Sequence, residues 1–191
     1  MRKVLRALAV RRWAASLAAL LLRRRIGVGP GDTALGYARE QVPMMLVLAC
    51  VLALETALVG LLVPWPVVHL VDVCAVLQVV VLLAVLVTRP HFVGRDRLVL
   101  RNGARFELEL PLESITSVSA ARKSHRGATF QFHEGELAIV VGNQTNVRVE
   151  LAEPIRVTLP NGTAQEVGQV RFRADEPALA VSTIRALTAA G

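Results

Sequence analysis

The chain has 191 residues, of which 53% are hydrophobic, and a formal net charge of +7. The excess charge lies at one end: residues 1–25 hold eight Lys/Arg and no acid, residues 26–90 hold two bases and four acids, and residues 91–191 hold twelve bases and eleven acids. The nearly neutral C-terminal half argues against nucleic-acid binding. High hydrophobicity after a basic N-terminal segment indicates a membrane protein.

The basic N-terminal segment looks at first like a signal peptide, because charged residues precede an Ala/Leu-rich run. That run, residues 13–22, is too short to span a bilayer and ends in three arginines instead of a small-residue cleavage site. We expect a helix on the anionic inner leaflet. A disordered tail, or residues upstream of the true start codon, are the alternatives. The basic residues at the membrane surface would be Arg11, Arg12, Arg23, Arg24 and Arg25.

A glycine-rich break at residues 27–32 separates this segment from the rest of the chain. It lacks the Gly-Lys-Ser/Thr ending of a phosphate-binding loop, so we interpret it as a linker. Residues 33–41 then lead toward the membrane, where Tyr37 and Arg39 suit an interfacial anchor.

Two long apolar runs, residues 42–63 and 67–87, dominate the sequence. At ~1.5 Å per residue each can cross a hydrocarbon core of ~30 Å as a helix. Prolines at 64 and 66, on either side of Trp65, predict a turn between them and hence a transmembrane hairpin. Basic residues flank both outer ends, so both termini should be cytoplasmic. Cys50 and Cys74 lie at different depths, which argues against a disulfide.

Three ionisable residues fall inside the predicted spans: Glu55, His69 and Asp72. A charged group in hydrocarbon is unfavourable unless it is paired, hydrated or neutralised. His69 and Asp72 are three residues apart on one helix and could pair, with Glu55 at a depth similar to that of Asp72. We interpret the three as polar contacts that hold a hairpin or an oligomer together. An ion- or proton-handling cluster, or a tolerated position near the interface, are the alternatives.

From residue 94 onward the apolar residues alternate, which is typical of half-buried strands. Asn102-Gly103 predicts a type I′ hairpin with Phe106, Leu108 and Leu110 facing inward. Asp175 is the expected N-cap of a C-terminal helix. The fold class is therefore a membrane α-helical hairpin plus an α+β or all-β domain, an antiparallel barrel or sandwich capped by a helix. The expected strands are 98–100, 106–110, 115–119, 129–132, 137–141, 147–151, 155–159 and 167–172.

The run RPHFVG, followed by DRLVLRNGARFELELPLESITSV and later by TNVRVELAEPIRVTLPNG and VRFRADEPALAVSTIRAL, resembles bacterial membrane-anchored pleckstrin-homology-like proteins. It is especially similar to an actinobacterial group that places a Tyr-Ala-Arg-Glu segment and two spans before such a domain. The likeness covers roughly residues 35–188. It implies a Glu in the first span and a His in the second, matching Glu55 and His69, whereas Asp72 has no counterpart. It implies fold and placement, and no activity.

The predicted domain shows little sign of catalytic chemistry. His125 and His133 have polar neighbours but form no recognisable triad or metal motif, so we interpret them as exposed loop residues. One basic cluster, Arg122, Lys123 and Arg126, lies in the loop after the third predicted strand. It could contact anionic headgroups or an acidic partner; an ordinary solvated turn is the simpler interpretation.

The sequence therefore predicts three parts: a basic segment (residues 1–41), a hairpin (42–88) and a pleckstrin-homology-like domain (93–191). We expect a bacterial inner-membrane protein without cofactor or enzymatic activity, an interaction or scaffold module that binds membrane lipid and protein and self-associates. A small oligomeric ion or proton transport component using Glu55, His69 and Asp72 is the first alternative. An enzyme whose site is not recognised is the second.

Overall fold

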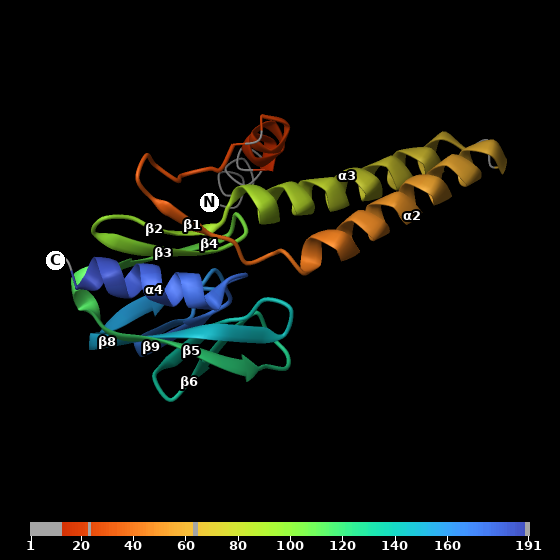
Figure 1. Cartoon of the computed structure of the whole chain (residues 1–191). Coiled ribbons are helices and arrows are strands. Elements are labelled where there is room, and N and C mark those ends of the chain that lie inside the picture. Colours follow the sequence, from red (N-terminus) through yellow and green to blue (C-terminus); the bar gives the residue numbers. More distant parts are fainter. Residues whose placement is uncertain (1–12, 23, 63–64, 190–191) are drawn as a thin grey trace.

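The computed structural model describes residues 13–22, 24–62 and 65–189. It confirms a helical hairpin attached to a β domain with a C-terminal helix (Figure 1). The hairpin helices are α2 (Gln41–Leu62) and α3 (Pro66–Thr88), of 22 and 23 residues. Both are long and apolar enough to cross a membrane. They lie side by side and project away from the β domain (Figure 1).

Prolines set both ends of α3. Pro66 occupies the first turn of α3, where its missing N–H costs no intrahelical hydrogen bond. At the other end, the backbone N–H of Arg89 closes the last turn on the Val85 carbonyl. Pro90 follows and cannot continue the helix, so the chain passes directly into a strand.

The β domain consists of two sheets. One sheet has the order β1-β2-β3-β4 and is antiparallel throughout. Its strands are β1 (Thr33–Leu35), β2 (His91–Val93), β3 (Arg97–Asn102) and β4 (Phe106–Pro111). The strand β1 comes from before the hairpin and pairs with β2, which comes after it. The expected domain boundary at residue 93 therefore leaves out β1 and the first two residues of β2, which belong to the same sheet as β3 and β4.

The second sheet has the order β5-β8-β9-β7-β6. Here β7 and β9 run parallel, so the expectation of a purely antiparallel domain is wrong at this pair. The strands are β5 (Ile115–Ser124), β6 (Phe130–His133), β7 (Glu136–Ile139), β8 (Gln144–Thr158) and β9 (Ala164–Phe172), with the short 3-10 helix η1 (Leu112–Ser114) leading into β5.

Two turns differ from their predicted form. Asn102 pairs with Phe106, so the first hairpin has a three-residue loop instead of a two-residue type I′ turn. Tight two-residue turns with positive φ at both positions occur instead at Glu134-Gly135 and Gly142-Asn143. The expected break between the strands 147–151 and 155–159 is also absent, because β8 runs through both with a register shift between Glu150 and Ile155. Proline is tolerated in a strand at such an interruption.

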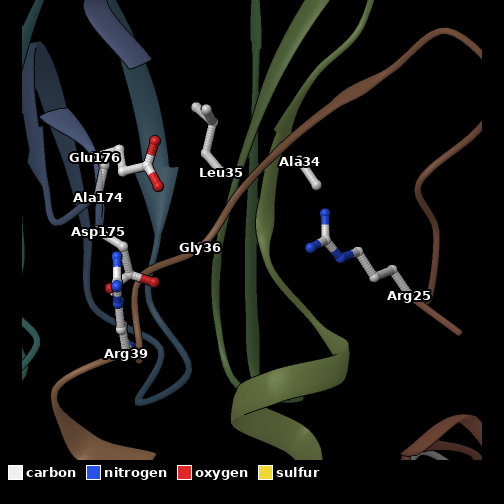
Figure 2. Close-up of a pocket in the computed structure, with 8 residues that line it drawn as sticks. All are labelled: Arg25, Ala34, Leu35, Gly36, Arg39, Ala174, Asp175 and Glu176. Atoms are coloured by element: carbon white, nitrogen blue, oxygen red, sulfur yellow. The ribbon is translucent and has the colours of Figure 1, made fainter. Parts of the chain in front are cut away.

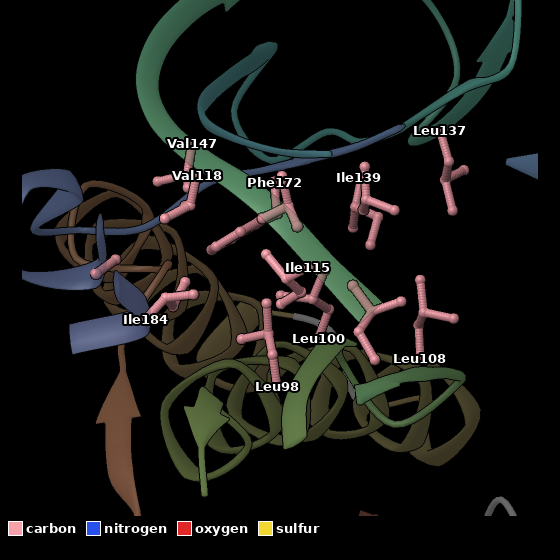
Figure 3. Close-up of a cluster of buried hydrophobic side chains, with 14 of the residues drawn as sticks. Leu98, Leu100, Leu108, Ile115, Val118, Leu137, Ile139, Val147, Phe172 and Ile184 are labelled. Carbon is pink, nitrogen blue, oxygen red and sulfur yellow. The ribbon is translucent and has the colours of Figure 1, made fainter. Parts of the chain in front are cut away.

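The core lies between the two sheets (Figure 3). Alternating residues Phe106, Leu108 and Leu110 are buried as predicted, while Glu107 and Glu109 remain exposed. The helix α4 (Pro177–Thr188) lies along one side, between the sheets (Figure 1), and buries Ala180, Val181 and Ile184. Its N-cap is Glu176 and not Asp175 as predicted, since Asp175 is engaged elsewhere.

Candidate functional site

The most distinctive part of the molecule is the junction where the hairpin meets the β domain. We define the junction as residues 24–41, 86–92, 101–103 and 172–176. Its chain segments come from four separate parts of the sequence and are tied together by main-chain hydrogen bonds. The N–H of Ile26 donates to the Thr88 carbonyl at 2.8 Å, and the N–H of Asp175 donates to the Gly36 carbonyl at 2.7 Å.

His91 is the central buried polar group of the junction and has no exposed surface. Its Nδ1 accepts the N–H of Arg101 at 2.8 Å, and its Nε2 donates to the Arg173 carbonyl at 3.1 Å. One ring nitrogen must accept and the other must donate, which specifies the neutral tautomer with the proton on Nε2. Burial, with a smaller contribution from the Arg101 charge, lowers the pKa of His91 to about 3.

Tyr37 stacks on the His91 ring with centroids 4.5 Å apart, and Phe172 meets the same ring edge-on at 5.3 Å. The Tyr37 hydroxyl accepts the N–H of Gly103 at 3.1 Å. Burial raises the pKa of Tyr37 above its ordinary value. The expectation that Tyr37 anchors the chain at the lipid interface is therefore wrong, because its ring lies inside the protein.

Two arginines connect the domain to the segments outside it. Arg173, whose side chain is 8% exposed, pairs with Glu40 at 2.6 Å, directly before the first residue of α2. Arg101 donates to Glu107 at 2.8 Å and to the Ile26 carbonyl at 2.7 Å, and its guanidinium lies 4.8 Å from the Phe92 ring centroid. The Arg173–Glu40 ion pair holds the start of α2, and the hydrogen bond from Arg101 to Ile26 holds the segment that precedes β1.

The N-terminal helix also reaches the junction. Residues 13–21 are helical, and the buried Ser16 accepts a hydrogen bond from Arg89 Nε at 3.0 Å. Trp13 and Leu21 on this helix, and Leu22 directly after it, remain exposed. Of the predicted membrane-surface residues, Arg24 and Arg25 are exposed. Arg11, Arg12 and Arg23 lie outside the described residues.

The structure does not bring the three ionisable residues of the hairpin together. Glu55 is exposed on the outside of α2. Asp72 is half-buried between the helices, and its Oδ2 is buried without a hydrogen-bond partner among the described residues. His69 is half-buried opposite Gly60 of α2. Within the part of the chain that the structure describes, no hydrogen bond or ion pair joins these side chains to one another.

Two residues of the predicted basic cluster lie in a strand, and one of these two forms an ion pair. Arg122 and Lys123 lie in β5 and not in a loop, and only Arg126 follows the strand. Lys123 pairs with Glu136 at 2.9 Å, and Arg171 pairs with the same carboxylate at 2.6 Å. Partial burial opposes ionisation of Glu136, but these two hydrogen bonds outweigh it and lower the pKa of the carboxyl group. The side chains of Arg122 and Arg126 remain exposed.

The two histidines of the domain differ from each other. His133 is exposed, as predicted, although it lies in β6. His125 is buried, contrary to the prediction, and its Nε2 lies 2.9 Å from the Thr145 hydroxyl. Among the described residues, no three His, Cys, Asp or Glu side chains gather closely enough to hold a metal ion.

A polar cavity of about 240 Å³ opens at the outer edge of β1 (Figure 2). It combines two arginines with two acids and so has no net charge of its own. One of these acids, Asp175, already accepts the Arg39 backbone N–H at 3.0 Å. The cavity lies within the junction and is lined by Arg25, Ala34, Leu35, Gly36, Arg39, Ala174, Asp175 and Glu176.

Comparison with known proteins finds no matching family model, no matching curated protein and no matching solved structure. The functional argument therefore depends on the junction, the hairpin and the exposed edges of the β domain.

Proposed function

We propose that this chain is a membrane-anchored, non-catalytic interaction module. The hairpin crosses the bacterial inner membrane, and a pleckstrin-homology-like domain at the cytoplasmic surface binds a protein partner. The observation that carries the proposal is the pairing of β1 with β2 around the hairpin. With the Glu40–Arg173 ion pair, it attaches the domain directly to the bases of both helices. A domain attached in this way presents one constant face to the cytoplasm.

The same pairing supports the topology. The strands β1 and β2 flank the hairpin and share a sheet, so both ends of a membrane-crossing hairpin lie on one side. The exposed Arg24 and Arg25 lie near that end, and basic residues favour the cytoplasmic side. The helix of residues 13–21, held by Arg89 at the foot of α3, would lie at the lipid surface with Leu21 and Leu22 toward the acyl chains.

The outer strand of the second sheet is the surface that we assign to the protein partner. The strand β6 pairs only with β7 in that sheet, so it presents one row of backbone groups outward. Its Phe130 and Phe132 are half-buried, which leaves apolar surface beside that edge. An outer strand with adjacent apolar side chains suits a partner that adds a strand of its own.

Lipid headgroups are the competing ligand for the domain. Of the predicted headgroup contacts, Lys123 already has a carboxylate partner. Only Arg122 and Arg126 of that set present exposed charge without a carboxylate beside it in the described structure. Two separated arginines on a nearly neutral domain favour a protein partner over a specific anionic lipid.

Site-specific photo-crosslinking of the full-length protein in its native membrane tests this proposal. A photo-reactive amino acid at His133 in β6 should capture one defined heterologous protein. The matched control position is Asn161, which is also exposed but lies in the turn after β8. Equal capture at both positions, or capture of lipid only, would contradict a partner at β6. Release of the protein from membranes by alkaline carbonate would contradict the membrane anchor itself.

A further inference from the structure

Two polar side chains lie on the outside of the hairpin at positions that lipid would surround. Glu55 of α2 and Gln78 of α3 are both exposed. Acyl chains offer neither hydrogen-bond donors nor acceptors, so polar groups at this depth are unfavourable unless protein covers them. Each of these side chains therefore needs a partner from outside its own hairpin.

The seam between the helices shows which face carries these two residues. From Met45 onward the half-buried residues of α2 recur at spacings of four and three, and they are Met45, Ala49, Leu52, Thr56 and Val59. On α3 the equivalent half-buried or buried residues include Asp72, Ala75, Val76 and Val79. Such spacing marks the line along which two helices meet.

Glu55 comes one position before the seam residue Thr56, and Gln78 one position before the seam residue Val79. One residue corresponds to a rotation of about 100° around an α-helix. Because α2 and α3 run in opposite directions and face each other, the same rotation on both leads to the same side of the hairpin. Glu55 and Gln78 thus share one face, which we call the Glu55 face.

The two residues also lie at similar depth. Counted from Trp65 at the corner, Glu55 is ten residues away and Gln78 thirteen. These separations correspond to ~15 Å and ~20 Å along the helices, so they differ by about one turn. The extended side chains of glutamate and glutamine can bridge one turn. Both positions fall near the middle of a hydrocarbon core of ~30 Å.

We propose that a second copy of this chain covers the Glu55 face, and that Glu55 of each copy hydrogen-bonds to Gln78 of the other. A two-fold rotation about the membrane normal keeps every residue at its depth and places α3 of one copy opposite α2 of the other. The Gln78 amide donates to the Glu55 carboxyl group, and the bond occurs twice in the pair. This inference deepens the proposed function and rests on its membrane-crossing hairpin.

The opposite face of the hairpin provides a matched control. Ala57 and Val73 each come one position after the seam residues Thr56 and Asp72, so they lie on the face away from Glu55. Both are exposed and both are eight residues from Trp65. A cysteine pair at 57 and 73 therefore probes the opposite face at ~12 Å from the corner, which is ~3 Å from the depth of Glu55 and ~8 Å from that of Gln78.

Disulfide trapping between two differently tagged full-length copies tests the arrangement. Both copies carry Cys50→Ser and Cys74→Ser, which remove the two native thiols. One copy then carries Glu55→Cys and the other Gln78→Cys, and the membranes are oxidised. A mixed-tag disulfide dimer is expected with this pair and not with Ala57→Cys and Val73→Cys. Trapping at the control pair alone, or equally at both, would overturn the proposal.

Dissociation in liposomes gives a second measurement with native cysteines present. Glu55→Leu and Gln78→Leu should each raise the dissociation constant about tenfold, because two interhelical hydrogen bonds are lost per dimer. Glu55→Gln keeps a hydrogen-bonding group and should stay within about threefold of the unaltered protein. Unchanged dissociation in both leucine variants would contradict the proposal. A carbonate wash separates the two failures: a retained monomer refutes only the dimer, whereas a released protein refutes the membrane anchor.

Discussion

The junction and the hairpin differ in whether their polar side chains have partners in the same chain. In the junction, His91, Tyr37 and Arg173 are buried, and each finds its partner within the same chain. In the hairpin, Glu55 and Gln78 are exposed, and Asp72 has a buried oxygen without a partner among the described residues. One copy of the chain thus supplies the partners of these polar groups in the junction, whereas the polar groups of the hairpin are left to find partners outside it.

This difference predicts that the junction affects the stability of one chain and that the hairpin affects the association of chains. A buried donor or acceptor without its partner costs about 1–3 kcal/mol, so changes in the junction should act on stability. Exposed polar residues of the hairpin contribute little to the fold of one chain, so changes there should act on association. Four measurements, taken from the largest expected effect to the smallest, test this division.

Replacement of His91 by alanine should have the largest effect. It leaves the Arg101 N–H and the Arg173 carbonyl without their partner and opens a cavity beside Tyr37. We expect a loss of about 4 kcal/mol in the free energy of unfolding, measured by thermal unfolding of the full-length protein in detergent. His91→Gln can restore part of the hydrogen bonding and should lose less. Equal losses in both variants would show that ring packing, and not hydrogen bonding, fixes this position.

Acid should destabilise the same site. The pKa of His91 is lowered to about 3 in the folded protein, so the folded protein keeps a neutral ring while the unfolded chain takes up a proton below its ordinary pKa of 6.5. Stability is then fully present above pH 6.5 and falls as the pH drops toward 3. The expected loss between pH 6.5 and pH 5 is about 2 kcal/mol. In His91→Gln this part of the pH dependence should disappear, and its persistence would point to another group.

Glu40→Ala should have a smaller effect that is confined to the attachment of α2. It leaves the guanidinium of Arg173 without its carboxylate, but the Glu40 side chain is 76% exposed, so water screens the pair. We expect a loss of about 1–2 kcal/mol. Amide hydrogen exchange should rise in residues 36–42 and stay unchanged in β8. A uniform rise across the domain would mean that the ion pair supports the whole fold and not the attachment alone.

Glu55→Gln should have the smallest effect on folding. The side chain is exposed on α2 and makes no ion pair among the described residues, so the unfolding temperature of the β domain should not move measurably. An effect below about 0.5 kcal/mol is expected. A larger shift would show that the hairpin and the junction are energetically coupled, and the division drawn above would fail.

Much of the fold could be predicted because it depends on local pattern. Continuous apolar runs fixed α2 and α3 to within a residue or two, and alternation identified the inward-facing residues of β4. The strand β1 could not be found in this way. Three residues, Thr33–Leu35, are too few to show a period, and they become a strand only because β2 lies beside them.

The junction was missed for the same reason. In the sequence, His91 follows Arg89 and Pro90 at the end of a span and looks like one more polar residue beside the membrane. Tyr37 looks like an aromatic residue at the lipid interface. Only tertiary structure stacks the two rings, which are 54 positions apart, and encloses them. The positions of Glu55, His69 and Asp72 along their helices were predictable. Their different facings depend on the seam between α2 and α3, which uniformly apolar helices barely reveal.

The β1–β2 pair has a consequence for biosynthesis. The residues of β1 leave the ribosome before the hairpin does, and their pairing partner His91–Val93 is made only after both helices are complete. If the hairpin crosses the membrane as we propose, the first sheet can therefore close only when both ends of the hairpin lie on one side. A chain with a single inserted helix would leave β1 and β2 in different compartments, with an unfinished sheet exposed to proteases. Completion of this sheet would thus exclude a chain in which only one of the two helices has inserted.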